Sequence, residues 1–411
     1  MTSPSGARID ALDLIRGVAM LGILAVNMEG FAGPIAATIT PDWNGAVSGS
    51  DHFAFAATLV LFEGKMRALL SLLFGASMLL FVESAESTGR NGDRLQMRRL
   101  AWLAVIGYLH FALLWWGDIL FTYAFCGFFA LLLRHLPVRA MIPVALLAFA
   151  SWHGNGTAAS VEPVLAEMRM AANSSPPPEK ARLSLQSAEN SQDARAEAAR
   201  EQGSYPALVR HKLTKESDLP MTVALNTIGE TLPLMLIGMG LFRGGFFSGG
   251  WTRRQLKVTA LIGVGLGGLL TLGLTAICWS QDFRPELMNA MLAWWLATPH
   301  LAMGIGYAAL LVLVAQRAGN GWLGRRIRAV GRMALSNYLG STLVMTALFY
   351  GWGFGLQGSV PERWYWPFML AGWLIMLWAS PWWLARFRQG PIEWAWRSLT
   401  QWRRLPFRRG V

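Results

Sequence analysis

The stretch RRLAWLAVIGYLHFALLWWGDILFTYAFCGFFALLLRH, residues 98–135, contains two long apolar runs joined by Gly117-Asp118. A helix needs ~20 apolar residues to cross a bilayer, and a Gly-Asp pair between two such runs is typical of a turn. The stretch therefore predicts two neighbouring membrane spans, 98–117 and 118–135. We expect Asp118 to cap the second helix, because its side chain can accept hydrogen bonds from the backbone amides at a helix start.

The composition of the 411-residue chain points to the same class of protein. Hydrophobic residues make up 54% and charged residues 15%, whereas a soluble domain carries roughly 25% charged residues. This balance excludes a soluble globular, disordered, collagen-like or disulfide-rich secreted protein. Cys126 and Cys278 both lie in apolar segments, so we expect neither a disulfide framework nor a metal site.

Apolar runs of spanning length recur along the whole chain, and we predict an all-α, polytopic integral membrane bundle of about ten transmembrane helices. The second run is too long for one straight crossing, so we expect a bend in it. The predicted spans are 12–32, 53–82, 98–117, 118–135, 139–156, 221–242, 258–279, 290–316, 332–354 and 365–386.

The predicted units follow from these spans. They are an N-terminal bundle, 1–156, a polar external insert, 157–220, a C-terminal bundle, 221–390, and a basic tail, 391–411. The proline run 176–178 breaks the insert, and the stretch 179–202 is polar and rich in helix-forming residues, which predicts a polar helix. A mobile linker is the alternative for this insert.

The basic residues orient the bundle. Arginine and lysine are concentrated in one alternating set of short connections and in both tails, whereas the other short set holds only Arg284 and Arg363. Because basic loops stay in the cytoplasm, we expect both termini in the cytoplasm and the insert 157–220 outside. The net charge of +12 then reflects topology and contact with anionic lipid, so we expect membrane lipid as a partner and no nucleic acid.

Several polar and ionisable residues fall inside the predicted spans. Such groups are costly in hydrocarbon, by ~2.5–3.5 kcal/mol on insertion scales, and therefore mark a functional site or a structural pair. Their depth separates a basic cytoplasmic vestibule from a mixed-charge cavity that opens outward. The residues are Asp13, Arg16, Asn27, Glu29, Glu63, Lys65, Arg67, His110, Asn226, Glu230, His300, Arg332 and Asn337.

Each of these residues also has a structural interpretation. Asp13 with Arg16, and Glu63 with Arg67, can pair along their own helices. Asn226 and Glu230 share a helix face and can join neighbouring helices by hydrogen bonds. A lone intramembrane histidine, such as His110 or His300, can be a packing residue.

The sequence resembles the YeiB-like family of bacterial inner-membrane proteins, which carries domain of unknown function 418. The resemblance covers nearly the whole chain and rests on several segments taken together. They are RIDALDLIRGVAMLGILAVN (8–27), FEGKMRALLSLLFG (62–75), RRLAWLAVIGYLHFALLWWGDILFTYAFCG (98–127), LPLMLIGMGLFRGGFF (232–247), VGRMALSNYLGST (330–342) and GPIEWAWRSLT (390–400).

The first of these segments is also remotely similar to transmembrane acyltransferases, namely the acyltransferase-3 proteins and the heparan-glucosamine N-acetyltransferases. That resemblance implies transfer of an acyl group from cytoplasmic acyl-CoA, such as acetyl-CoA, to a sugar or glycan on the far side. Acyltransferase-3 proteins carry a catalytic histidine at a fixed spacing after the arginine that Arg16 matches. Here Asn27 stands at that place.

We therefore expect a membrane acyltransferase with a glycan, lipid or small-molecule acceptor. Histidine is the natural general base near neutral pH, and we assign that role to His110. Arginine suits phosphate, so the basic vestibule is expected to hold CoA. The candidate residues are His110, Glu63, Glu230, Asn27, Asp118 and His300 for catalysis, Arg16, Arg332, Asn337, Arg98 and Arg99 for CoA, and Lys65, Arg67 and Asn226 for the acceptor.

Two other functions stay open at this stage. Paired charges at mid-membrane and an external cap also suit a secondary transporter or permeation protein for a small solute. A non-catalytic envelope scaffold is the third interpretation. A homo-oligomer is compatible with each of the three.

Overall fold

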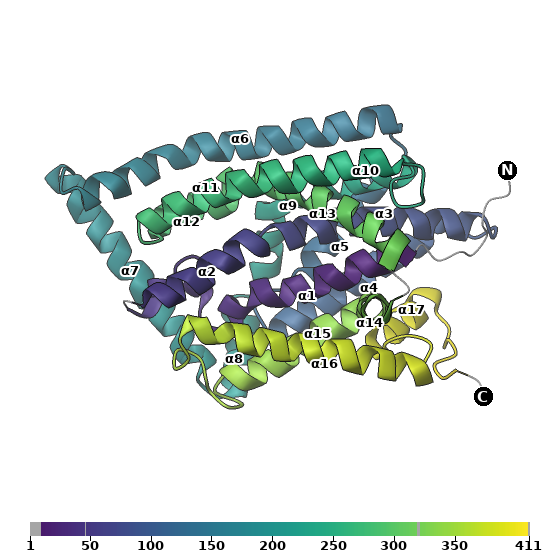
Figure 1. Ribbon diagram of the computed structural model, residues 1–411. Coiled ribbons are helices and arrows are strands. Elements are labelled where there is room, and N and C mark those ends of the chain that lie inside the picture. Colours follow the sequence, from purple (N-terminus) through teal and green to yellow (C-terminus); the bar gives the residue numbers. More distant parts are fainter. Residues whose placement is uncertain (1–9, 46, 319–320, 410–411) are drawn as a thin grey trace.

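The computed structural model describes residues 10–45, 47–318 and 321–409, and over these residues the chain is a bundle of α-helices (Figure 1). The helices of the first half are α1 Asp10–Ala32, α2 Gly49–Leu61, α3 Lys65–Glu86, α4 Gly92–Leu113, α5 Leu120–Leu133, α6 Val138–Ala171, α7 Pro177–Glu201 and α8 Tyr205–Lys215. Those of the second half are α9 Leu219–Arg243, α10 Arg253–Ala260, α11 Gly267–Ser280, α12 Pro285–Ala290, α13 Ala297–Ala318, α14 Trp322–Arg332, α15 Ala334–Phe349, α16 Tyr365–Arg386 and α17 Pro391–Gln401.

Six helical segments within these residues are long and apolar enough to cross a membrane, and two shorter helices, α5 and α15, are also apolar. The all-helical class is thereby confirmed, and the chain has the features of a membrane protein. The six segments are Ala11–Ala32, Gly49–Glu86, Leu219–Arg243, Arg253–Ser280, Ala297–Arg317 and Glu362–Arg386. Side chains such as Leu261 and Leu269 project outward from the bundle with 74% and 69% exposure, as expected of a lipid-facing surface.

Local sequence signals explain where several helices begin and end. The expected bend in the second run lies between α2 and α3, where Gly64 has a φ of 70°, a conformation that glycine adopts without strain. Asp118 serves the start of α5 as expected, from the position before the N-cap residue Ile119: its Oδ2 accepts a hydrogen bond from the Phe121 amide at 2.7 Å. Two short π-helical segments join neighbouring helices. Leu261–Leu266 has six residues and joins α10 to α11, and Met291–Trp295 has five residues and joins α12 to α13.

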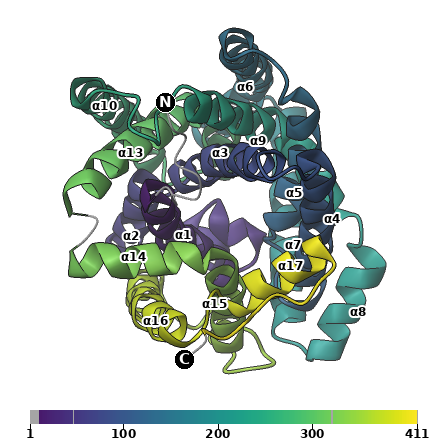
Figure 2. The same ribbon diagram turned by 90° about the vertical axis from the view of Figure 1, so that its right-hand side faces the viewer.

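The bundle has a central pair of helices, α1 and α3, with the other long helices around them (Figure 2). α3 packs against α9, α4 and α13, and α1 packs against α14, α15 and α3. α1 begins on the side of the molecule where α17 lies, whereas α7 lies at the opposite end (Figure 1). The helix bundle therefore has two distinct ends, one basic and one covered by the insert.

The polar stretch of the insert forms a helix, α7, as predicted, while α6 continues past residue 156 to Ala171. The insert packs onto the end of the bundle through buried charged side chains. Glu201 accepts a hydrogen bond from the Tyr350 hydroxyl at 2.6 Å. Lys212 donates from Nζ to the carbonyl oxygen of Phe111 at 3.2 Å, at the end of α4.

We expect the attachment of this insert to weaken as pH rises. Burial raises the pKa of Glu201 from 4.5 to about 8, so between these values the docked state binds a proton that the detached state does not. The free energy that favours docking of the insert therefore falls by up to about 1.4 kcal/mol for each unit of pH increase. Lys212, whose pKa is lowered by burial to about 8, keeps its charge over the lower part of this window.

Hydrogen exchange of the α7 and α8 amides at pH 5.5 and 7.5, corrected for intrinsic rates, checks this prediction. Protection is expected to be higher at pH 5.5. Glu201→Gln is expected to reduce the difference, with the remainder due to Glu197 of α7, whose pKa is also raised by burial, to about 7. Glu189→Gln, an exposed position on α7, is expected to preserve it. Equal protection at both pH values in the unmodified protein would contradict the prediction.

Candidate functional site

The structure brings His110 together with Asp118 and with a threonine, Thr342. Nδ1 of His110 lies 2.8 Å from Oδ1 of Asp118, and Nε2 lies 3.1 Å from the Thr342 hydroxyl oxygen. A carboxylate only accepts hydrogen bonds, so Nδ1 of His110 donates to Asp118 and Nε2 is the nitrogen that faces the Thr342 hydroxyl. The side chains of His110 and Asp118 are 0% and 2% exposed.

Three elements hold this group in place. His110 is on the last turn of α4, Asp118 is in the turn before α5, and Thr342 is in the middle of α15. Gly107, one turn before the histidine, permits the approach of α4 and α5, because a Cβ there would lie 2.4 Å from the Phe121 nitrogen. A hydroxyl, an imidazole and a carboxylate in this order can act chemically as nucleophile, base and orienting acid.

Two tyrosines extend the group toward α3. The Tyr338 ring lies 4.9 Å from the His110 ring, and its hydroxyl donates to the Gly117 carbonyl oxygen at 3.2 Å. Tyr338 is close enough to Tyr123 for electrostatic interaction. The Tyr123 hydroxyl in turn lies 3.0 Å from the Ser71 hydroxyl on α3.

A second polar group centres on Arg67. Its Nε lies 3.3 Å from Glu230 Oε1 on α9, and its Nη1 lies 3.6 Å from Glu63 Oε1. The Tyr123 hydroxyl donates to the Arg67 carbonyl oxygen at 3.2 Å, so the Arg67 group and the His110 group are adjacent. The expected pair Glu63–Arg67 is present, and Glu230 joins it from another helix.

Lys65 and His300 lie near this group but face other atoms. Nζ of Lys65, which is fully buried, donates to the carbonyl oxygen of Leu59 at 2.7 Å. His300 packs against Gly64, where a Cβ would lie 1.8 Å from its Nδ1. Its Nε2 is buried without a hydrogen-bond partner among the residues that the structure describes.

The basic candidates gather at the other end of the bundle. Arg16 contacts Asp13 at 3.0 Å, as the pair expected within α1, and also donates to the Ser77 hydroxyl at 2.8 Å. The Arg99 guanidinium lies between the rings of Phe81 and Trp396, 4.1 and 4.6 Å from their centroids.

Each of the other residues expected to bind CoA has a contact of its own. Arg98 lies over the ring of Trp402 at 5.5 Å. Asn337 donates to the Val330 carbonyl oxygen at 3.1 Å and to Ser380 at 3.0 Å. Arg332 donates to the Arg388 carbonyl oxygen at 3.5 Å.

Two of the candidates are placed apart from these groups. Asn27 is half-buried on α1, whereas the His110 group is built from α4, α5 and α15. Asn226 is exposed on α9, although Glu230 one turn later is turned inward toward Arg67. The shared face expected for Asn226 and Glu230 thus does not bring both side chains to the same contacts.

Thr342, Tyr338 and Tyr123 were missed by the sequence reasoning. Hydroxyl groups are ordinary in apolar helices, where threonine commonly bonds to its own backbone. The Thr342 hydroxyl lies 3.1 Å from the Tyr338 carbonyl oxygen as well as from Nε2 of His110, and its single hydrogen serves one of the two at a time. His110 stands out in the sequence because it is an ionisable residue in an apolar span, whereas a neutral hydroxyl does not. Proximity to a buried histidine is visible only in the folded chain.

Comparison with known proteins identifies the family. The family model described as "Protein of unknown function (DUF418)" matches residues 241–403. The chain is 30% identical to the uncharacterized protein YeiB of Escherichia coli K12 over 407 residues, 95% of each chain. It is 27% identical to the uncharacterized protein YxaH of Bacillus subtilis 168, over 96% of this chain and 94% of that one. No solved structure matches the chain. The near-complete alignment to YeiB shows that this chain belongs to the YeiB-like DUF418 family, as the sequence segments indicated.

Proposed function

We propose that the protein is a membrane-embedded acyltransferase that moves an acyl group from cytoplasmic acyl-CoA to a glycan, lipid or small-molecule acceptor at the outer side. The observation that carries the proposal is the contact series Thr342–His110–Asp118 inside the helix bundle. A hydroxyl facing the free nitrogen of an oriented imidazole is the arrangement that activates an oxygen nucleophile.

In the first half of the reaction, Nε2 of His110 takes the proton of the Thr342 hydroxyl as its oxygen attacks the thioester carbonyl carbon. A C–O bond forms, the C–S bond breaks, and the proton passes from His110 to the leaving CoA sulfur. In the second half, an acceptor hydroxyl gives its proton to His110 and takes the acyl group, and Thr342 regains its hydrogen. Asp118 holds the imidazole in the required tautomer throughout.

The basic end of the bundle supplies the CoA site in this proposal. Arg16 and Arg99 lie close enough to interact electrostatically, and guanidinium groups bind phosphate oxygens in pairs. Arg99 and His110 are on the same helix, eleven positions apart, which corresponds to ~16 Å at 1.5 Å per residue. The pantetheine arm of CoA would extend along α4 from the phosphates to the reacting hydroxyl.

The membrane topology belongs to the same proposal. Ten crossings are formed by α1, the α2–α3 pair, α4, α5, α6, α9, the α10–α11 pair, the α12–α13 pair, α15 and α16. Both termini face the cytoplasm of a bacterial inner membrane, and the 157–220 insert is external. Two features support this arrangement: the one-sided distribution of arginine, and the positions of α17 and α7 at opposite ends of the bundle (Figure 1).

Labelled acetyl-CoA tests the proposal directly. Purified protein in lipid nanodiscs is expected to release free CoA thiol and to carry the label on the peptide containing Thr342. Thr342→Val is expected to abolish the label. Thr346→Val is the matched control, because Thr346 is also buried on α15 and donates to the Thr342 carbonyl oxygen. Absence of thiol release across a series of acyl-CoA chain lengths would contradict the enzymatic proposal.

A solute or proton pathway is the second candidate function, and the Arg67 group favours it. An arginine between a glutamate of the α2–α3 turn and a glutamate of α9, with His300 nearby, is the type of group that lines transport routes in membranes. Flux of a solute into proteoliposomes without consumption of acyl-CoA would support this alternative over acyl transfer.

A further inference from the structure

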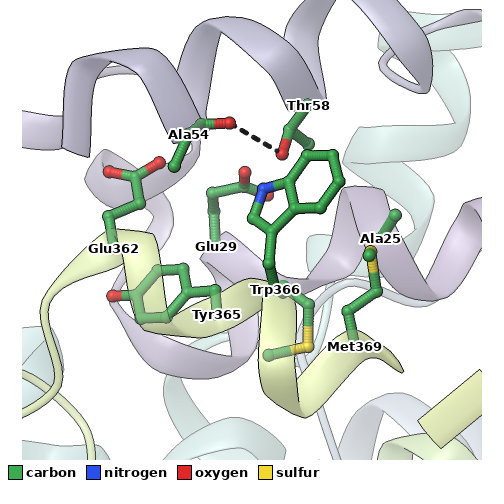
Figure 3. Close-up of a pocket in the computed structure, with 9 residues that line it drawn as sticks. Ala25, Glu29, Ala54, Thr58, Glu362, Tyr365, Trp366 and Met369 are labelled. Carbon is green, nitrogen blue, oxygen red and sulfur yellow. Dashed lines mark hydrogen bonds between the residues drawn. The ribbon is translucent and has the colours of Figure 1, made fainter. Parts of the chain in front are cut away.

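Two buried glutamates share a small cavity that the acyl-transfer proposal does not use. Glu29 of α1 and Glu362, in the turn before α16, line it together with Thr58 of α2, Tyr365 and Trp366 (Figure 3). Glu29 and Glu362 are 7% and 8% exposed. The cavity volume is about 10 Å³, which is enough for one particle of the size of a water molecule.

The carboxylate of Glu362 is incompletely satisfied. Its Oε1 atom is buried and has no hydrogen-bond partner within the described part of the chain. An unpaired carboxylate oxygen removed from water carries a large desolvation cost unless a positive charge or a proton compensates it. The cavity beside this atom is therefore where the missing partner belongs.

The surrounding charged groups do not supply that partner. Arg363, the neighbour of Glu362, turns to Asp51, with its Nη1 2.9 Å from Oδ2. His52 faces Asp42, with its Nε2 3.1 Å from Oδ1. Asp51 and Asp42 add to the negative potential at Glu362, and Glu63 adds to that at Glu29.

The structure assigns to this cavity a binding site for one small monovalent metal cation of the size of Na⁺, held between the carboxylates of Glu29 and Glu362 with Thr58 at its edge. The carboxylates of Glu29 and Glu362 and the Thr58 hydroxyl offer at most five oxygen ligands, which is enough for a five-coordinate Na⁺. A divalent ion fits less well, because Ca²⁺ takes six to eight oxygens and Mg²⁺ keeps several waters for which this cavity has no room. Among the described residues, no three acidic, histidine or cysteine side chains converge as a metal-ion group. Tyr365 and Trp366 add aromatic rings to the lining, and an aromatic ring can bind a cation through its face.

Thermal unfolding of the full-length protein in nanodiscs, with NaCl replaced by choline chloride at constant ionic strength, tests this site. A cation that binds only the folded protein raises its Tm with concentration. We expect Na⁺ to raise Tm and choline to leave it unchanged, and KCl and methylammonium chloride arms distinguish a metal ion from an organic ammonium. In Glu362→Gln, the Na⁺ concentration that gives a half-maximal rise in Tm is expected to increase at least tenfold.

The controls separate ion binding from folding. Because the amide removes one of two like charges, Glu362→Gln in choline is expected to melt no earlier than the unmodified protein in choline. Glu189→Gln, exposed on α7, is expected to keep the full Na⁺ response. Direct binding of ²²Na⁺ to immobilised unmodified protein gives a second measurement that does not depend on unfolding. If Glu362→Gln fails to fold, Glu29→Gln is the alternative variant.

Three results would overturn the assignment. The first is an equal Tm in Na⁺ and choline for the unmodified protein. The second is an undiminished Na⁺ response in both Glu362→Gln and Glu29→Gln. The third is a stability that depends on pH but not on Na⁺, K⁺ or methylammonium, since a shared proton alone would then neutralise the two carboxylates.

Discussion

Replacing His110 with alanine is expected to lower the rate of acyl transfer by about 10²–10⁴-fold, the usual contribution of a positioned general base. The imidazole is the group in contact with both Asp118 and the Thr342 hydroxyl, so its loss leaves the hydroxyl without a proton acceptor. The rate is measured as thiol release from acetyl-CoA by protein in nanodiscs, at matched protein concentration and with Tm recorded for each variant.

Two further variants make this result interpretable. Alanine at position 110 removes a fully buried side chain, so His110→Gln, which preserves most of the volume, distinguishes lost chemistry from lost packing. His135→Ala changes an exposed histidine and is expected to retain the full rate. A His110→Gln protein with an unchanged rate and an unchanged Tm would rule out the role of this residue as the base.

Replacing Gly238 with alanine is expected to cause a large loss of stability of the bundle. A Cβ at Gly238 on α9 would lie 2.0 Å from the Leu72 carbonyl oxygen on α3. Gly75 of α3 is in the reciprocal position, with its added Cβ 2.0 Å from the Met235 carbonyl oxygen. Both contacts are with backbone, so the two helices must separate, at a cost of about 1–3 kcal/mol or more.

Thermal unfolding followed by size-exclusion chromatography measures this effect. Gly273→Ala is the matched control, since this glycine of α11 has no heavy atom within 4 Å of its added Cβ. Alanine there is expected to be neutral or to stabilise the helix by up to ~1 kcal/mol. The double variant Gly75→Ala with Gly238→Ala is expected to lose less than the sum of the two single variants, because once the helices have separated the second methyl group finds space. A Gly238→Ala protein as stable as the Gly273→Ala control would show that the α3–α9 crossing is looser than described.

Helix positions were largely predictable, because the signals that determine them are local. The bend at Gly64, the cap at Asp118 and the polar helix after the proline run all depend on residues within one or two turns. The extent of α6 was not predictable in the same way: it passes through Pro143 and Pro163, which the sequence alone favours as interruptions.

The polar contacts separate into those visible in the sequence and those formed only by packing. The pair Asp13–Arg16 is three residues apart within α1, so helical geometry alone brings it together. Glu63 and Arg67 are four residues apart, but Glu63 lies in the turn before α3, so the bend at Gly64 also determines that contact. Glu230 reaches Arg67 from a distant helix, and Asn226, on the same predicted face, does not. A side chain's direction into the bundle depends on which neighbour its helix meets.

By itself, the sequence determined that this chain is an apolar, all-helical protein of the YeiB-like family. Hydrophobicity, capping and charge are properties of short segments, and they act before any two helices meet. Only the tertiary structure decided that His110 faces Thr342, 232 positions away, and that Glu29 and Glu362 enclose one cavity. Such contacts depend on how helices cross, and a crossing depends on the shapes of two surfaces that the linear order of residues does not specify.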